Sequence, residues 1–192
     1  MQKHKLSGPA VFMYSAMVLM TVISAVCFSL YYFEVYKTTV ILWTGIVSFM
    51  VLYHFSLRIF MGNITKRFRI DYNHCWYRQR NFEKSLYKIL AVRKWKRKVL
   101  TFEPEAFDIK NRTLEQIATA MSEAELDHWI NEVISVTSIF FVFLWGCLPA
   151  FLISAVLAIL FDAQFIVVQR YNRPVVLRLI EKQKLRAVVH NA

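Results

Sequence analysis

The sequence predicts an all-α integral membrane protein with four transmembrane helices and a cytoplasmic, partly interfacial helical segment between the second and third spans. Long stretches without charged residues lie near both ends of the chain, and a basic polar segment separates them. About 20 apolar residues cross a bilayer as a helix. Hydrophobic residues make up 57% of the chain and aromatic residues 16%, a content typical of proteins with aromatic belts at the bilayer interface.

The four spans follow from these apolar stretches. The first is too long for the apolar region of a signal peptide and is expected to be retained. The last apolar stretch, Val133 to Val168, is too long for one ordinary span, and Gly146 and Pro149 near its middle favour a tight turn. A single kinked helix or a re-entrant pair is the alternative. The predicted spans are residues 8–33, 38–57, 131–146 and 150–169 of a single membrane domain, 1–192.

The placement of Lys and Arg predicts the orientation. From Arg58 to Glu132 the chain holds 15 Lys and Arg against 10 Asp and Glu. The positive-inside rule therefore places three parts in the cytoplasm: the N-terminus with Lys3 and Lys5, residues 58–130, and the tail 170–192. The net charge of +11 would suggest nucleic acid in a soluble protein, but here it flanks the spans, so we expect no nucleic-acid partner.

The basic segment from Phe82 to Leu100 mixes aromatic and aliphatic residues with Lys and Arg. This pattern is typical of a helix that lies on anionic head groups. Simple adhesion to the membrane is one interpretation, and a docking surface for an anionic ligand such as a CoA or an acidic carrier protein is the other. His74 nearby is a further candidate substrate contact, although isolated histidines of this kind are more often structural.

A second helix is predicted from Thr113 into the third span, because Thr113 and Gln116 match a capping box. Its apolar stripe leads to Glu125 and His128, which share a face three residues apart. A carboxylate that orients an imidazole at a membrane interface suits general base catalysis, so both are candidate catalytic residues. The alternative is structural, because Ser122 and Glu125 also match a capping box.

Polar residues in and after the last span form the third group of candidates. Asp162 lies inside the span, where an acid is costly and marks either a functional site or a hydrogen bond that holds the helices together. Arg170, Asn172 and Arg173 follow at the end of the span. They are either topology anchors or a binder of phosphate or carbonyl groups. Pro174 is expected to move Arg173 out of helical geometry.

These motifs resemble the bacterial glycosyl-4,4'-diaponeurosporenoate acyltransferase family over about Lys88 to Leu179. The resemblance rests most on the run Gln169-Arg170-Tyr171-Asn172-Arg173-Pro174, followed by Leu177-Arg178-Leu179. The pair Trp95-Lys96 and the block Ala124-Glu125-x-x-His128 also match. Members of this family attach a fatty acyl chain to a sugar hydroxyl of a glycosylated carotenoid at the cytoplasmic membrane.

The resemblance implies a multi-pass O-acyltransferase of the bacterial cytoplasmic membrane, with a glycosylated carotenoid or another glycolipid as acceptor. It implies an acyl-CoA or acyl-carrier thioester as co-substrate, no bound cofactor and no metal. Trp95 and Lys96 join the candidate substrate-binding residues. The alternative is a non-enzymatic membrane scaffold or a subunit of a lipid-modifying complex, and the oligomeric state stays open. Motifs of hydrolases, P-loop proteins, zinc proteases and Rossmann enzymes do not occur in the sequence.

The predicted topology is tested with single cysteines in a thiol-free background. A cysteine near Lys37 or Leu148 should react with an impermeant reagent in intact cells, because these loops are predicted to face outward. A cysteine near Lys110 should stay unlabelled until the membrane is opened. Labelling at Lys110 in intact cells would contradict the orientation.

Overall fold

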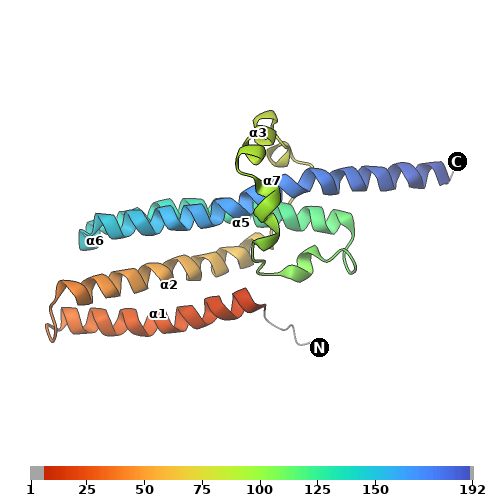
Figure 1. Cartoon of the computed structure of the whole chain (residues 1–192). Helices are drawn as coiled ribbons and strands as arrows, with labels where there is room; N and C mark the ends of the chain where they lie inside the picture. Colours follow the sequence, from red (N-terminus) through yellow and green to blue (C-terminus); the bar gives the residue numbers. More distant parts are fainter. Residues whose placement is uncertain (1–6, 191–192) are drawn as a thin grey trace, which may run out of the picture. The chain divides into compact units, whose positions relative to one another are not determined.

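The computed structural model describes residues 7–190, and every regular element in that range is helical (Figure 1). Lys3 and Lys5 lie outside the described residues. The structure confirms four helices long and apolar enough to span a membrane, and the chain is a membrane protein. They are Gly8–Tyr32, Thr39–Thr65, Leu114–Trp145 and Leu148–Val189.

The helices are as follows, with η for 3-10 turns. The long ones are α1 (Gly8–Tyr32), α2 (Thr39–Thr65), α5 (Leu114–Thr137) and α7 (Leu148–His190). The short ones are η1 (Cys75–Tyr77), α3 (Asn81–Ile89), α4 (Val92–Trp95), η2 (Lys96–Lys98), η3 (Pro104–Phe107), η4 (Ser138–Phe141) and α6 (Val142–Trp145). The chain forms two compact units, the first made of Met1–Asn63 and Ile130–Phe161 and the second of Ile64–Trp129 and Asp162–Ala192.

The first unit has an apolar and aromatic core. Its fully packed centre consists of Ile46, Met50, Cys147 and Phe151. Around this centre the Phe28 and Trp145 rings stack with their centroids 5.4 Å apart, and the Trp145 indole donates a 2.9 Å hydrogen bond to the Tyr32 hydroxyl. Between helices in a membrane, association depends on such close packing and on hydrogen bonds, because the lipid chains are themselves apolar.

The turn predicted between the last two spans is present. α6 ends at Trp145, and Gly146 takes the left-handed conformation with φ 67°. Glycine adopts this conformation without the steric conflict that a Cβ atom creates. Pro149 then lies in the first turn of α7, where the missing N–H has no partner to lose.

The last helix is longer than predicted. α7 runs 43 residues and continues beyond residue 169, and the expectation that Pro174 moves Arg173 out of helical geometry is wrong. The proline removes the hydrogen bond to the carbonyl of Arg170. Arg170 and Arg173, in the turn before the proline, form side-chain ion pairs with neighbouring segments, as described below. α2 also continues beyond the predicted end at residue 57, to Thr65.

The segment between the second and third spans differs from the single helix expected over Phe82–Leu100. Ala91 has φ 48° and separates α3 from α4, and η2 follows directly. The capping box at the start of α5 is confirmed: the Gln116 N–H donates to the Thr113 hydroxyl at 3.2 Å, and the Thr113 N–H donates to the Gln116 side chain at 3.0 Å. A second cap at Ser122 is wrong, because Ser122 lies inside α5 and donates to the Ala118 carbonyl.

The Gly146 turn gives a test of backbone strain. Gly146→Ala should lower the free energy of unfolding by about 1 kcal/mol, because the left-handed conformation disfavours a Cβ atom. A Cβ at Gly146 would have no atom within 4 Å, so no steric contact contributes. Gly8→Ala is the control, because Gly8 is equally open but has no positive φ. Thermal denaturation in detergent measures both, and an equal effect at both sites would contradict the assignment.

Candidate functional site

The candidate site lies in the second unit, where α5 and α7 run antiparallel. His128 of α5 contacts Asp162 of α7, with 2.9 Å between the imidazole Nδ1 and the carboxylate Oδ1. The Asp162 side chain is fully buried, whereas the His128 side chain is 20% exposed. The structure therefore pairs a buried acid with a histidine that can still be reached from outside.

The ring of His128 is held on a second side by an aromatic neighbour. The Phe165 ring stacks on the imidazole with the centroids 4.5 Å apart and the planes 7° from parallel. With Nδ1 on the carboxylate and one ring face on Phe165, the rotation of the imidazole is fixed. The carboxylate selects the tautomer with the proton on Nδ1, which leaves Nε2 as the nitrogen available to accept a proton.

The sequence suggested that Glu125 orients His128, but in the structure Glu125 pairs with two arginines instead. Its carboxylate lies 2.6 Å from both Arg170 and Arg173 and is fully buried. The expected pair of Glu125 and His128 is replaced by the pair of Asp162 and His128. Residues three apart on a helix differ by about 60° in direction, and in α5 this difference is enough to point them at different turns of α7.

Arg170 is the most fully bonded residue of this cluster. Its guanidinium donates to the Glu83 carboxylate from Nε at 3.0 Å and from Nη2 at 2.6 Å. Nη1 donates to Glu125 at 2.6 Å and to the Trp76 carbonyl at 3.1 Å, and Nη2 also donates to the Arg78 carbonyl. These five hydrogen bonds use all five guanidinium N–H groups. Arg170 is therefore a structural cross-link in this structure, where the sequence suggested a substrate contact.

Arg173 occupies the centre of the same cluster. Its side chain is 1% exposed and pairs with Glu125 at 2.6 Å. It also donates to the carbonyls of Tyr77 at 3.1 Å and Met121 at 3.0 Å, and its guanidinium lies 4.9 Å from the Tyr77 ring centroid. This environment is closed to a substrate, so Arg173 too holds segments together. Burial, and then the negative charge of Glu125, raise the pKa of the Tyr77 hydroxyl.

Sequence reasoning missed Glu83, which completes the cluster. It lies on α3, and with Glu125 it balances the charges of Arg170 and Arg173. The Tyr87 hydroxyl, one turn further along α3, donates to Glu83 at 2.6 Å. Burial and this hydrogen bond raise the pKa of Tyr87. One signal was present: Glu83 is the only acid between Phe82 and Leu100, among many cations.

The predicted contacts Lys96 and Asn172 meet in the same unit. The Lys96 ammonium donates to the Asn172 side-chain oxygen at 2.5 Å and lies 4.6 Å from the Tyr171 ring centroid. Trp95 is bonded locally, since its indole donates to the Leu90 carbonyl at 2.9 Å. His74 caps η1, because its Nδ1 accepts from the Trp76 N–H at 3.3 Å. Trp95 and His74 thus have local structural partners.

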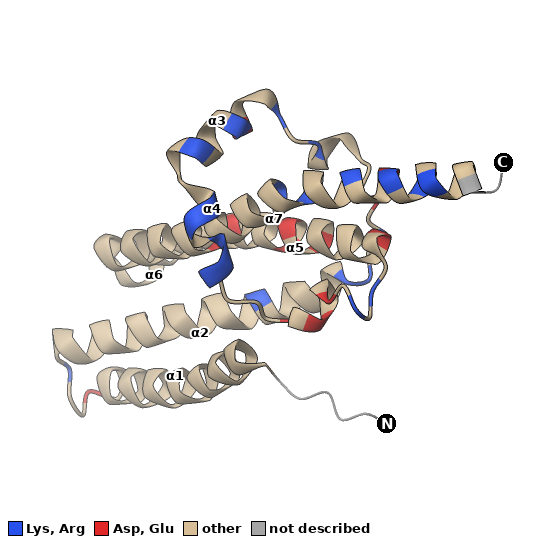
Figure 2. Ribbon diagram, turned by 45° about the vertical axis from the view of Figure 1, so that its right-hand side comes forward, with Lys and Arg blue, Asp and Glu red and all other residues tan. Residues whose placement is uncertain are grey.

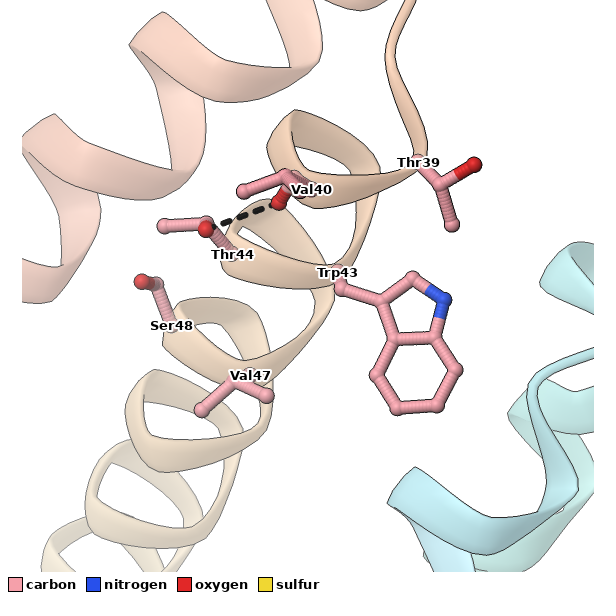
Figure 3. Close-up of a pocket in the computed structure, with 6 residues that line it drawn as sticks. All are labelled: Thr39, Val40, Trp43, Thr44, Val47 and Ser48. Carbon is pink, nitrogen blue, oxygen red and sulfur yellow. Dashed lines mark hydrogen bonds between the residues drawn. The ribbon is translucent and has the colours of Figure 1, made fainter.

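Charge is unevenly distributed along the chain. Figure 2 shows Lys and Arg gathered on α3, α4 and the C-terminal half of α7, while α1 and most of α2 carry neither sign of charge. In the first unit a shallow hollow of about 500 Å³ follows one face of α2 (Figure 3). Its six lining residues, from Thr39 to Ser48, carry no ionisable group, so this hollow offers no acid–base chemistry.

The structural role of Arg170 can be tested by a conservative change. Arg170→Lys should lower the free energy of unfolding by about 2 kcal/mol or more, because an ammonium replaces at most three of five charge-assisted hydrogen bonds. Arg178→Lys is the matched control on the same helix, where the guanidinium is exposed and bonds only to the Pro174 carbonyl. Denaturation in detergent measures both variants, and an Arg170→Lys protein as stable as the control would contradict the cross-link.

Comparison with known families assigns the chain to a family. The family model of glycosyl-4,4'-diaponeurosporenoate acyltransferase matches residues 73–182, more than half of the chain. Neither a curated protein nor a solved structure matches the chain. The match includes His128, Asp162, Arg170 and Arg173. The chain belongs to the glycosyl-4,4'-diaponeurosporenoate acyltransferase family.

Proposed function

We propose that this protein transfers a fatty acyl group from a thioester donor to a hydroxyl of a glycosylated carotenoid or another glycolipid. Membership of an acyltransferase family supports the reaction class. The observation that carries the proposal is the pair of His128 and buried Asp162, because hydroxyl attack on a thioester needs a base. In this proposal His128 is the catalytic base and Asp162 is its positioning residue.

The proposed reaction is a direct acyl transfer. Nε2 of His128 removes the proton of the acceptor hydroxyl while the oxygen attacks the thioester carbonyl. A carbon–oxygen bond forms and the carbon–sulfur bond breaks. The proton on His128 then passes to the departing thiolate, so the products are an ester and a free thiol. Asp162 stabilises the imidazolium between these two proton transfers.

The proposed location of the reaction is the cytoplasmic face of a bacterial cell membrane. α3 supports an interfacial position, because Glu83 and Tyr87 face inward while its apolar residues face outward. Glu83 and Tyr87 are buried, whereas Phe82 is 61% exposed and Ile89 80%. Lys84 and Lys88 flank the exposed apolar side chains, a combination that suits an anionic bilayer surface.

A membrane scaffold is the competing function, and Arg170 favours it, because all five of its guanidinium N–H groups bond to other parts of the chain. In a scaffold the pair of His128 and Asp162 would serve only as a hydrogen bond between α5 and α7, whereas in the enzyme it supplies a base. Acyl transfer by the purified chain, reconstituted without other proteins, separates the two. Lipid analysis of cells with and without the gene then identifies the acceptor.

The roles of the two carboxylates give the sharpest test. His128→Ala should lower kcat by roughly 10²–10⁴, as expected for loss of a general base. Asp162→Asn should also lower kcat, because the amide no longer fixes the tautomer or stabilises the imidazolium. Glu125→Gln should instead lower stability, because it weakens the pairing of two buried arginines.

Activity is measured per folded molecule with a labelled acyl donor. Asp127→Asn is the matched control, because it makes the same carboxylate-to-amide change next to His128, and Asp127 accepts from Thr65 and makes no hydrogen bond to the imidazole. Near-normal turnover in His128→Ala would reject the base. Equal effects of Asp162→Asn and Asp127→Asn would reject the positioning role.

A further inference from the structure

The residues after α3 form a cationic segment, Arg93–Lys98, that is short of acidic partners. Arg93 and Lys94 in α4 and Arg97 and Lys98 in η2 are all exposed. Within residues 7–190 none of these four pairs with a carboxylate, whereas Lys66 of the same unit pairs with Glu103. Unbalanced positive charge over so few residues attracts an anion.

Lys96 is the fixed point of this segment. Its ammonium is tied to the Asn172 side-chain oxygen and to the face of Tyr171. Partial burial, and then the charges of Arg97 and Arg93, lower the pKa of Lys96. An anion between these three cations would relieve their repulsion. The amide nitrogen of Asn172 has no acceptor among the described residues, and it adds a donor beside the ammonium.

The cationic segment exposes no large apolar side chain that would insert among lipid chains. The exposed side chains from Arg93 to Lys98 are all cationic, since Trp95 is half-buried. Val92, which precedes this segment, is buried. The neighbouring α3, in contrast, exposes Phe82 and Ile89, which suit insertion among lipid chains. The two parts thus expose different side chains. α3 exposes apolar side chains together with lysines, whereas the cationic segment exposes charged side chains alone.

We propose that Arg93, Lys96 and Arg97, with the amide of Asn172, bind the phosphate of the thioester donor. The inference rests on the proposed function, which supplies a thioester donor. Its phosphate comes either from CoA or from the phosphopantetheine arm of an acyl-carrier protein. Forked guanidinium groups and an ammonium form charge-assisted hydrogen bonds with phosphate oxygens.

The test measures binding without turnover. The purified chain in phosphatidylcholine nanodiscs is titrated with CoA, dephospho-CoA and pantetheine, and calorimetry gives each affinity. CoA should bind, dephospho-CoA more weakly, and pantetheine, which lacks phosphate, not at all. Replacing Arg93→Gln and Arg97→Gln together should weaken CoA binding roughly 100-fold, about tenfold for each lost charge-assisted contact.

The control replaces Lys182→Gln and Arg186→Gln, an exposed cationic pair with the same spacing on α7, and should leave CoA binding unchanged. Holo- and apo-acyl-carrier protein form a second arm. If the holo form binds the wild type but not the Arg93→Gln, Arg97→Gln protein, the inference is supported and the phosphate belongs to the carrier. Measurable and equal binding of CoA and pantetheine would overturn the inference, as would measurable and equal binding of CoA by both double variants.

Phosphatidylglycerol nanodiscs separate a lipid head group from the donor. The inference fails if these lipids stabilise the wild type but not the Arg93→Gln, Arg97→Gln protein, and if CoA and the holo-carrier bind to neither protein. The cationic segment would then contact lipid head groups. The proposed function fails differently. If the chain binds CoA as expected but transfers no acyl group, the phosphate site is supported and the proposed function is rejected. If the chain is active but its binding does not depend on phosphate, the proposed function is supported and the phosphate site is rejected.

Discussion

The buried ion network of Arg170, Arg173, Glu125 and Glu83 is the constraint on which the second unit depends. Removing four charges from water is costly, and the cost is offset here because each charge has an opposite partner and the guanidinium groups also reach backbone carbonyls. A change of register between the helices that carry these residues would separate the buried charges from their partners. The network therefore fixes α3, α5 and the η1 segment on α7 with little freedom to slide.

The geometry of the histidine pair follows from this fixed register. Glu125 meets the arginines of α7, and His128, one turn along α5, meets Phe165 and Asp162, one to two turns back along α7. A shift of α5 against α7 would separate His128 from Asp162. The network thus acts on the proposed chemistry at a distance, by holding a base and its carboxylate in hydrogen-bond contact.

Four consecutive residues of α7 each contact another segment of the second unit. Arg170 holds α3 through Glu83, Tyr171 packs on Tyr87 and lies under Lys96, Asn172 accepts from Lys96, and Arg173 holds α5 through Glu125. The helix continues through Pro174, directly after these four residues. The most specific motif of the sequence is therefore mainly an assembly point, and it links the cationic segment to the helix that carries Asp162.

The sequence by itself determined the four spans, the turn at Gly146 and the cap at Thr113, because hydropathy, left-handed glycine and capping depend on consecutive residues. Tertiary structure decided the partners: Asp162 for His128, the arginines for Glu125, and Glu83 as the missed acid. Side-chain pairing depends on the rotation and register of two helices, which a single helical pattern does not contain. One of these contacts could have been predicted in part. His128 and Phe165 lie nearly equally far in sequence from the turn at Gly146, and residues so placed in two antiparallel helices come close together.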